Sequence, residues 1–201
     1  MDKQVQNITD QIQTQLAGQL MGLFEQVMQT RQSAHQSDPN LARQSVDSII
    51  GSYSNKNAAI SGSLNLIPGP AGMLAVIPDI VLIMRNQISM VYDIGASYQK
   101  EAVITKELLL GIVIGATGAG TASLLVMQGS KILIKRTTLR TFQDFVSRLS
   151  GRVTQQAIRS SIGKWLPGVG AVAIAAWSYY ITRQIGKKAT EIFEREIIFE
   201  S

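Results

Sequence analysis

The sequence predicts an all-α fold, a bundle of about six helices whose central members are rich in glycine and alanine. Apolar side chains recur at three- and four-residue steps in most segments, and no segment alternates apolar and polar residues between hairpin turns. A Pro-Gly element also occurs twice, as LIPGPAG at 66–72 and WLPGVGA at 165–171. Since proline ends a preceding helix and glycine permits a sharp turn, the pair predicts two equivalent helix entries.

Residues 2–32 predict a long amphipathic helix with a glutamine-rich opposite face. Its apolar stripe comprises Val5, Ile8, Ile12, Leu16, Leu20, Leu23, Phe24 and Val27. A polar break, QSAHQSDPN, follows at 32–40, and Asp38-Pro39 is a start signal for a second helix from about 40 to 53. We therefore expect residues 1–60 to form N-terminal amphipathic helices and 61–201 to form the main helical domain. The long stripe within 1–32 offers a face for a homo-oligomer.

Three further helical stretches and a basic one complete the prediction. A helix is expected from 73 to 98, with Pro78 in its first turns, where a missing N–H costs little. The next starts near Thr105, whose hydroxyl can act as N-cap. A basic helix or helix pair covers about 136–164, and a final helix spans roughly 170–197.

Composition limits the chemistry available to the chain. Of its 201 residues 45% are apolar and only 16% are charged, a low value that points to much internal surface or to membrane contact. There is no cysteine, which excludes disulfides and thiolate metal sites. The first residues contain no apolar run typical of a secretory signal, so we expect a cytoplasmic protein.

The positive charge is concentrated in residues 131–164, which hold eight Lys and Arg side chains and one acidic residue, Asp144. Five arginines are the candidate anion-binding residues: Arg136, Arg140, Arg148, Arg152 and Arg159. Their four-residue steps form a slowly winding stripe on a helix whose other side is apolar. Such a helix can lie on an anionic membrane surface, while a merely solvated face over the core is the more ordinary explanation of the stripe. Nucleic acid is less favoured, because no aromatic residues are interleaved with the cations and no binding motif is present.

Residues 108–130 carry no charge over 23 positions, a length sufficient to cross a bilayer. Gly111, Gly115 and Ala119 repeat the spacing that lets membrane helices approach closely. A central helix of a water-soluble bundle is equally apolar, so both interpretations stay open. If the segment spans a membrane, it forms a helical hairpin with residues 72–98.

No pattern indicates a catalytic centre, a metal site or a cofactor. His35, the single histidine, falls in the polar break and is expected on the surface. Asp79 is the only charge between Lys56 and Arg85, and capping or an ion pair explains it better than catalysis. Glu107 suits the positive end of its helix dipole. Tyr92, Asp93 and Tyr98 form a candidate polar cluster at the end of the third helix.

Three segments resemble the EcsC-like family of bacterial proteins. They are IPGPAGMLAVIPDIVLIMRNQISMVYDIGASY (67–98), KELLLGIVIGA (106–116) and WLPGVGAVAIAAWSYYITRQIGKKATEIF (165–193). The matching positions are Pro68, Gly69, Asp79, Tyr98, Glu107, Pro167, Gly170, Ala171, Gly186 and Ala189. An uncharacterised helical domain of bacterial inner-membrane proteins, found beside some GTPases, is similar too. Where the family often has asparagine in the last helix, this chain has Trp177-Ser178. The resemblance implies an all-helical, membrane-associated bacterial protein without an established enzymatic activity.

The expected function is therefore that of a non-enzymatic interaction or scaffolding module at the cytoplasmic face of a bacterial membrane. Its expected partners are the membrane surface or anionic lipid, together with a protein that the sequence does not identify. Two alternatives remain: an integral membrane protein built on the hairpin, and an enzyme with a site around Asp79, Arg85 and Tyr92.

Overall fold

The computed structural model describes residues 3–62, 77–118, 124–163 and 170–200, and six α-helices make up most of them. The helices are α1 (Lys3–Ser37), α2 (Val46–Gly62), α4 (Ile77–Ser97), α5 (Lys106–Thr117), α6 (Leu139–Gly163) and α7 (Gly170–Phe193). Two 3-10 turns, η1 (Pro39–Arg43) and η2 (Glu101–Val103), join consecutive helices. The predicted all-α bundle of about six helices is confirmed.

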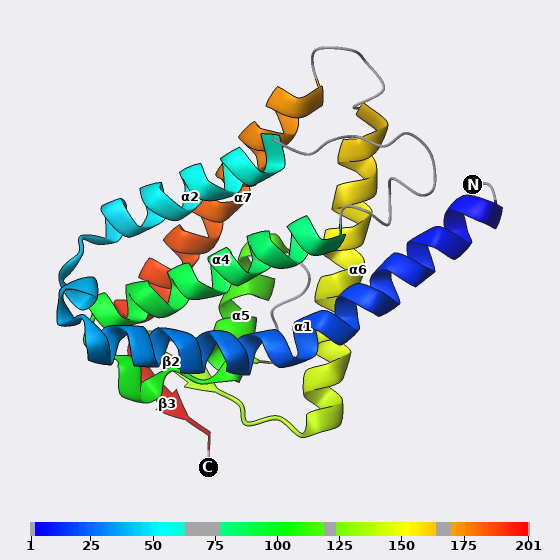
Figure 1. The fold of residues 1–201 in the computed structure, drawn as a ribbon. Coiled ribbons are helices and arrows are strands. Elements are labelled where there is room, and N and C mark those ends of the chain that lie inside the picture. Colours follow the sequence, from blue (N-terminus) through cyan, green and yellow to red (C-terminus); the bar gives the residue numbers. More distant parts are fainter. Residues whose placement is uncertain (1–2, 63–76, 119–123, 164–169, 201) are drawn as a thin grey trace.

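The helices pack as a bundle in which α2 and α7 lie side by side and antiparallel (Figure 1). Ile50 near the start of α2 contacts Gly186 near the end of α7, whereas Asn57 further along α2 contacts Thr182. Helix α4 packs against both, and α1 crosses α4 and α6. Helix α6 lies along one side of the molecule and has α1 as its main neighbour (Figure 1).

The predicted stripe of α1 is buried from Ile12 to Val27. Its side chains belong to the same apolar core as those of α4, α5 and α6, so α1 packs within its own chain. Helix α5 lies at the centre and is apolar all round: Leu108 to Leu110 and Ile112 to Ile114 are all buried. Its N-cap is Thr105, as predicted, whose side chain accepts from the Leu108 N–H. The proposed domain boundary at residue 60 lies within the last turn of α2.

The polar segment at 32–40 does not break the first helix where expected. Helix α1 continues to Ser37. The Asp38-Pro39 signal does start a helix, since Asp38 caps η1 by accepting from the Asn40 N–H at 3.0 Å. That element is a short 3-10 turn, however, and α2 begins only at Val46.

The structure contains a small sheet that the sequence did not predict. Its strands are β1 (Leu125–Gln128), β2 (Lys131–Ile134) and β3 (Glu196–Phe199). Strand β2 is central and pairs antiparallel with β1 and parallel with β3. The final helix therefore ends at Phe193, earlier than expected, and the chain continues into β3.

The charge-free segment 108–130 is not one helix. The alternative of a membrane hairpin, which required a continuous second helix over these residues, is therefore wrong in this helix. Helix α5 ends at Thr117, where Gly118 takes a left-handed conformation (φ 68°) that glycine adopts without strain. Strand β1 then begins at Leu125, whose side chain packs closely on Gly111 of α5. No helix in the described parts of the chain is both long enough and apolar enough to cross a membrane.

Candidate functional site

The predicted basic stripe lies on the solvent face of α6 and the segment before it. Arg136, Arg140, Arg148 and Arg152 are all exposed. The opposite side of α6, which includes Phe142, Val146 and Leu149, is buried in the core. Arg159 is also in α6, but its side chain lies outside the described ones.

None of the four exposed arginines forms an ion pair with a carboxylate that the structure describes. The neighbouring lysines differ, because they do have carboxylate partners. Lys131 of β2 pairs with Glu196 of β3, and Lys135, directly after β2, pairs with Glu200, directly after β3. The stripe therefore presents cations without neutralising partners. Leu139 lies beside it at the start of α6 and is 65% exposed, the highest value among the large hydrophobic side chains described.

The structure does not bring the residues of the proposed enzyme site together. Asp79 lies in the first turn of α4, where its charge suits the helix dipole, and it pairs with no described cation. Arg85 donates instead to Gln26 of α1 at 2.8 Å. Tyr92 is about 20 Å from Asp79 along the axis, at ~1.5 Å per residue. Glu107 also occupies the first turn of its helix, α5.

Four of the predicted motif residues belong to the two Pro-Gly elements. Pro68, Gly69 and Pro167 lie outside the described residues, and Gly170 is the first residue of α7.

The most densely connected polar cluster surrounds Asp93, near the end of α4. The Arg31 guanidinium of α1 donates to both carboxylate oxygens, from Nε to Oδ1 at 2.7 Å and from Nη2 to Oδ2 at 2.8 Å. His35, one helical turn further along α1, forms a hydrogen bond between Nε2 and Oδ1 at 2.9 Å. Tyr53 of α2 donates its hydroxyl to Oδ2 at 2.8 Å. One carboxylate thus connects three helices, and we name these four residues the Asp93 cluster.

The cluster lies in a region of low solvent access. The Asp93 side chain is only 8% exposed, and the hydrogen bonds from its cationic and neutral donors offset the cost of burying a carboxylate. Burial, together with the negative charge of Asp93, raises the pKa of the Tyr53 hydroxyl well above its ordinary value. Tyr53 therefore remains a proton donor over the whole physiological range.

His35 is not a surface residue, and the prediction that placed it in a loop is wrong. It belongs to α1, is 9% exposed and packs against the Tyr92 ring, with 5.6 Å between ring centroids. Its partner Asp93 is 58 positions away in the chain, a contact that no local pattern reveals. Of the candidate cluster Tyr92, Asp93 and Tyr98, only the first two lie here. Tyr98 donates to Glu194 instead, at 3.3 Å.

A cavity of about 450 Å³ lies beside the Asp93 cluster, between α1, the end of α4 and η2. His35 and Glu101 contribute hydrogen-bonding groups to its lining, and Tyr92 contributes an aromatic ring. Met28 and Ile104 contribute apolar side chains. Burial and the charge of Glu101, with a smaller effect of Asp93, raise the pKa of the Tyr92 hydroxyl.

A second polar cluster lies between α2, α4 and α7. The side-chain amide of Asn57 donates to Thr182 at 3.1 Å and accepts from Asn86 at 2.8 Å. Gln87 also donates to Thr182, at 3.1 Å. Ser178 of α7 donates to the Asn57 backbone carbonyl at 3.3 Å. All members except the half-buried Asn86 are buried, and they form hydrogen bonds with one another, which indicates a role in fixing how the three helices pack.

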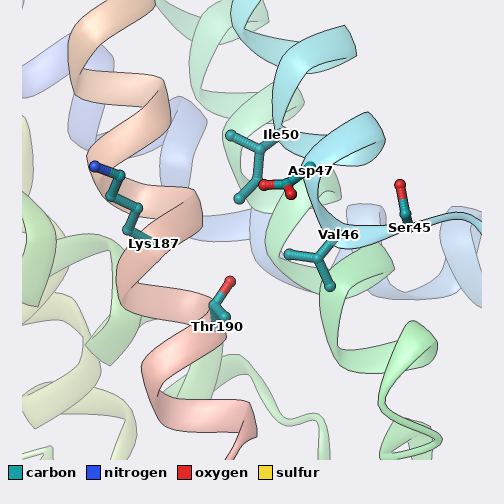
Figure 2. A pocket seen from close by; sticks show the side chains of 6 residues that line it. All are labelled: Ser45, Val46, Asp47, Ile50, Lys187 and Thr190. Atoms are coloured by element: carbon teal, nitrogen blue, oxygen red, sulfur yellow. The ribbon is translucent and has the colours of Figure 1, made fainter.

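A smaller hollow of about 310 Å³ lies where α2 begins beside the last part of α7 (Figure 2). Asp47 and Lys187 give it one charge of each sign, and Thr190 adds a hydroxyl. Neither here nor elsewhere in the described ranges do three or more His, Asp or Glu side chains gather in a way that could hold a metal ion.

Comparison of the chain with protein-family models, with curated proteins and with solved structures found no match, so the resemblance to the EcsC-like family stays a prediction.

Proposed function

We propose that this protein is a non-enzymatic helical module that binds anionic membrane surfaces through the solvent face of α6, at the cytoplasmic side of a bacterial membrane. The observation that carries the proposal is the row of exposed arginines, Arg136, Arg140, Arg148 and Arg152, without carboxylate partners among the described residues. A protein that keeps cations unpaired on one face leaves them available to an external anion.

Energetics favour a membrane over a single small anion. The four arginines are spread from the segment before α6 to its fourth turn, so one phosphate cannot reach all of them. A lipid surface presents many anionic headgroups, and each cation near it contributes roughly 1 kcal/mol. Leu139, exposed at the start of α6, supplies an apolar side chain that can enter the headgroup region beside Arg136 and Arg140.

Flotation of the full chain with vesicles tests the proposal. Phosphatidylcholine vesicles containing phosphatidylserine should carry the protein upward, and pure phosphatidylcholine vesicles should not. The variant R140Q/R148Q/R152Q should bind on the order of 100-fold more weakly, at roughly 1 kcal/mol per cation. Raising the salt concentration should weaken binding by the wild type, because the attraction is screened.

The matched control is R43Q/K56Q/K187Q, which removes the same charge from exposed cations of η1, α2 and α7. It should bind like the wild type. Equal weakening by both triple variants would mean that net charge alone drives binding, and absence of binding to the anionic vesicles would overturn the proposal.

A further inference from the structure

The cavity beside the Asp93 cluster is lined by apolar and hydrogen-bonding side chains, and His35 and Glu101 are among the latter. His35 Nε2 lies 2.9 Å from Asp93 Oδ1, and both oxygens of this carboxylate also accept hydrogen bonds from Arg31. Since an ionised carboxylate only accepts hydrogen bonds, Nε2 is the donor of the contact with it. In the neutral imidazole the other nitrogen, Nδ1, then carries a lone pair. It is buried and has no hydrogen-bond partner among the described residues. Such an acceptor is rare in proteins unless a ligand or water completes it.

Glu101 adds an uncompensated negative charge to the same cavity. Its side chain is exposed on η2 and pairs with no described cation. The adjacent Lys100 does not neutralise it, because that ammonium donates to the backbone carbonyls of Phe193 and Arg195 at 2.7 and 2.6 Å. The pKa of the Tyr92 hydroxyl is raised first by burial and then by the charges of Glu101 and Asp93, while Arg31 acts in the opposite direction.

We infer that this cavity binds a small organic ammonium ion with an apolar body. The Glu101 carboxylate would pair with the ammonium group, and His35 Nδ1 is the remaining acceptor for one of its three N–H donors. Met28, Ile104 and the Tyr92 ring would cover the apolar body. A volume of about 450 Å³ accommodates an arylalkylamine. This site is separate from the arginine face of α6.

The sequence provides a direct readout, because His35 is the only histidine of the chain. Its imidazole gives a single set of proton NMR signals in the full-length protein. Phenethylamine, titrated without vesicles at one fixed pH, should shift the His35 signals along a saturating curve. The neutral analogue 2-phenylethanol and the anion 3-phenylpropanoate match its aromatic body and should bind much more weakly.

The variant E101Q should weaken phenethylamine binding about tenfold or more, as expected for the loss of a charged hydrogen-bond partner. D47N removes an equally exposed carboxylate from the hollow in Figure 2 and should leave binding unchanged. The α6 variant R140Q/R148Q/R152Q should also bind phenethylamine normally, whether or not it binds vesicles. No saturable shift, equal binding of the neutral alcohol, or the same affinity in E101Q and D47N would each overturn the inference.

Discussion

Arg31 and Asp93 form a two-bond ion pair between α1 and α4, with distances of 2.7 and 2.8 Å, across 62 positions of sequence. The pair is asymmetric in burial, since the Arg31 side chain is 20% exposed and the Asp93 side chain 8%. Asp93 therefore depends on its partners more than Arg31 does. His35 and Tyr53 complete its shell, and together the four residues hold α1, α2 and α4 in one arrangement.

Replacing Arg31 with methionine should lower the free energy of unfolding by about 2–4 kcal/mol, because it leaves a buried carboxylate without its cation. Urea unfolding of the two proteins measures the difference. R183M removes an exposed arginine of α7 as the control and should change the stability by no more than about 0.5 kcal/mol. Equal stabilities of R31M and R183M would show that the Asp93 cluster does not stabilise the fold.

Tyr53 should make the protein less stable in alkali. Burial and Asp93 raise the pKa of its hydroxyl above the ordinary value of 10.0, so the folded state keeps a proton that the unfolded state loses. The free energy of unfolding is then unaffected below about pH 10 and falls above it, by up to about 1.4 kcal/mol per pH unit. Y53F should show a shallower decline in stability over the same range.

The exposed Tyr180 provides the control for this pH dependence. Y180F should follow the wild-type curve, because that side chain is 59% exposed. Parallel curves for Y53F and the wild type would contradict the shift assigned to Tyr53.

Asn57 should be the critical member of the second polar cluster. N57A removes its bonds to Asn86 and Thr182 and leaves those buried groups short of partners, at a cost of about 1–3 kcal/mol in the free energy of unfolding. N55A changes the same residue type two positions earlier on the exposed side of α2. In denaturant unfolding, the free energy of unfolding of N55A should stay near that of the wild type. A comparable loss of stability in both variants would mean that the effect comes from changing α2, not from breaking the polar cluster.

The sequence predicted the helices because their apolar periodicity is a local property. The stripe of α1 from Ile12 to Val27 is buried as its spacing indicated. The strands escaped prediction because each has only four residues, and β1 and β2 continue an apolar stretch that looks like the end of a helix. Strands β1 and β2 pair with each other as neighbours in the sequence, but their third partner β3 lies more than sixty positions beyond β2.

The functional groups were harder to predict, because several of their contacts join parts of the chain that are far apart in the sequence. The exposed arginines of α6 follow from a local repeat and lie where the pattern placed them. His35 does not, because its surroundings in the sequence are polar and its partners Asp93 and Tyr92 come from the distant helix α4. The cavity beside it is lined by three separate elements, α1, α4 and η2. The sequence does not show that these elements are neighbours in space.

Two glycine-to-alanine changes should have opposite effects on stability. In G186A the new Cβ would lie 2.7 Å from Cγ1 and 2.9 Å from Cδ1 of Ile50, a β-branched side chain with little freedom to move. Overpacking costs about 1–3 kcal/mol and outweighs the gain of up to about 1 kcal/mol that alanine brings to a helix. In G22A nothing lies within 4 Å of the new Cβ, so only the gain remains. Thermal or urea unfolding should therefore rank G22A above the wild type and G186A below it. The close packing of α2 on α7 would be contradicted if G186A proved as stable as G22A.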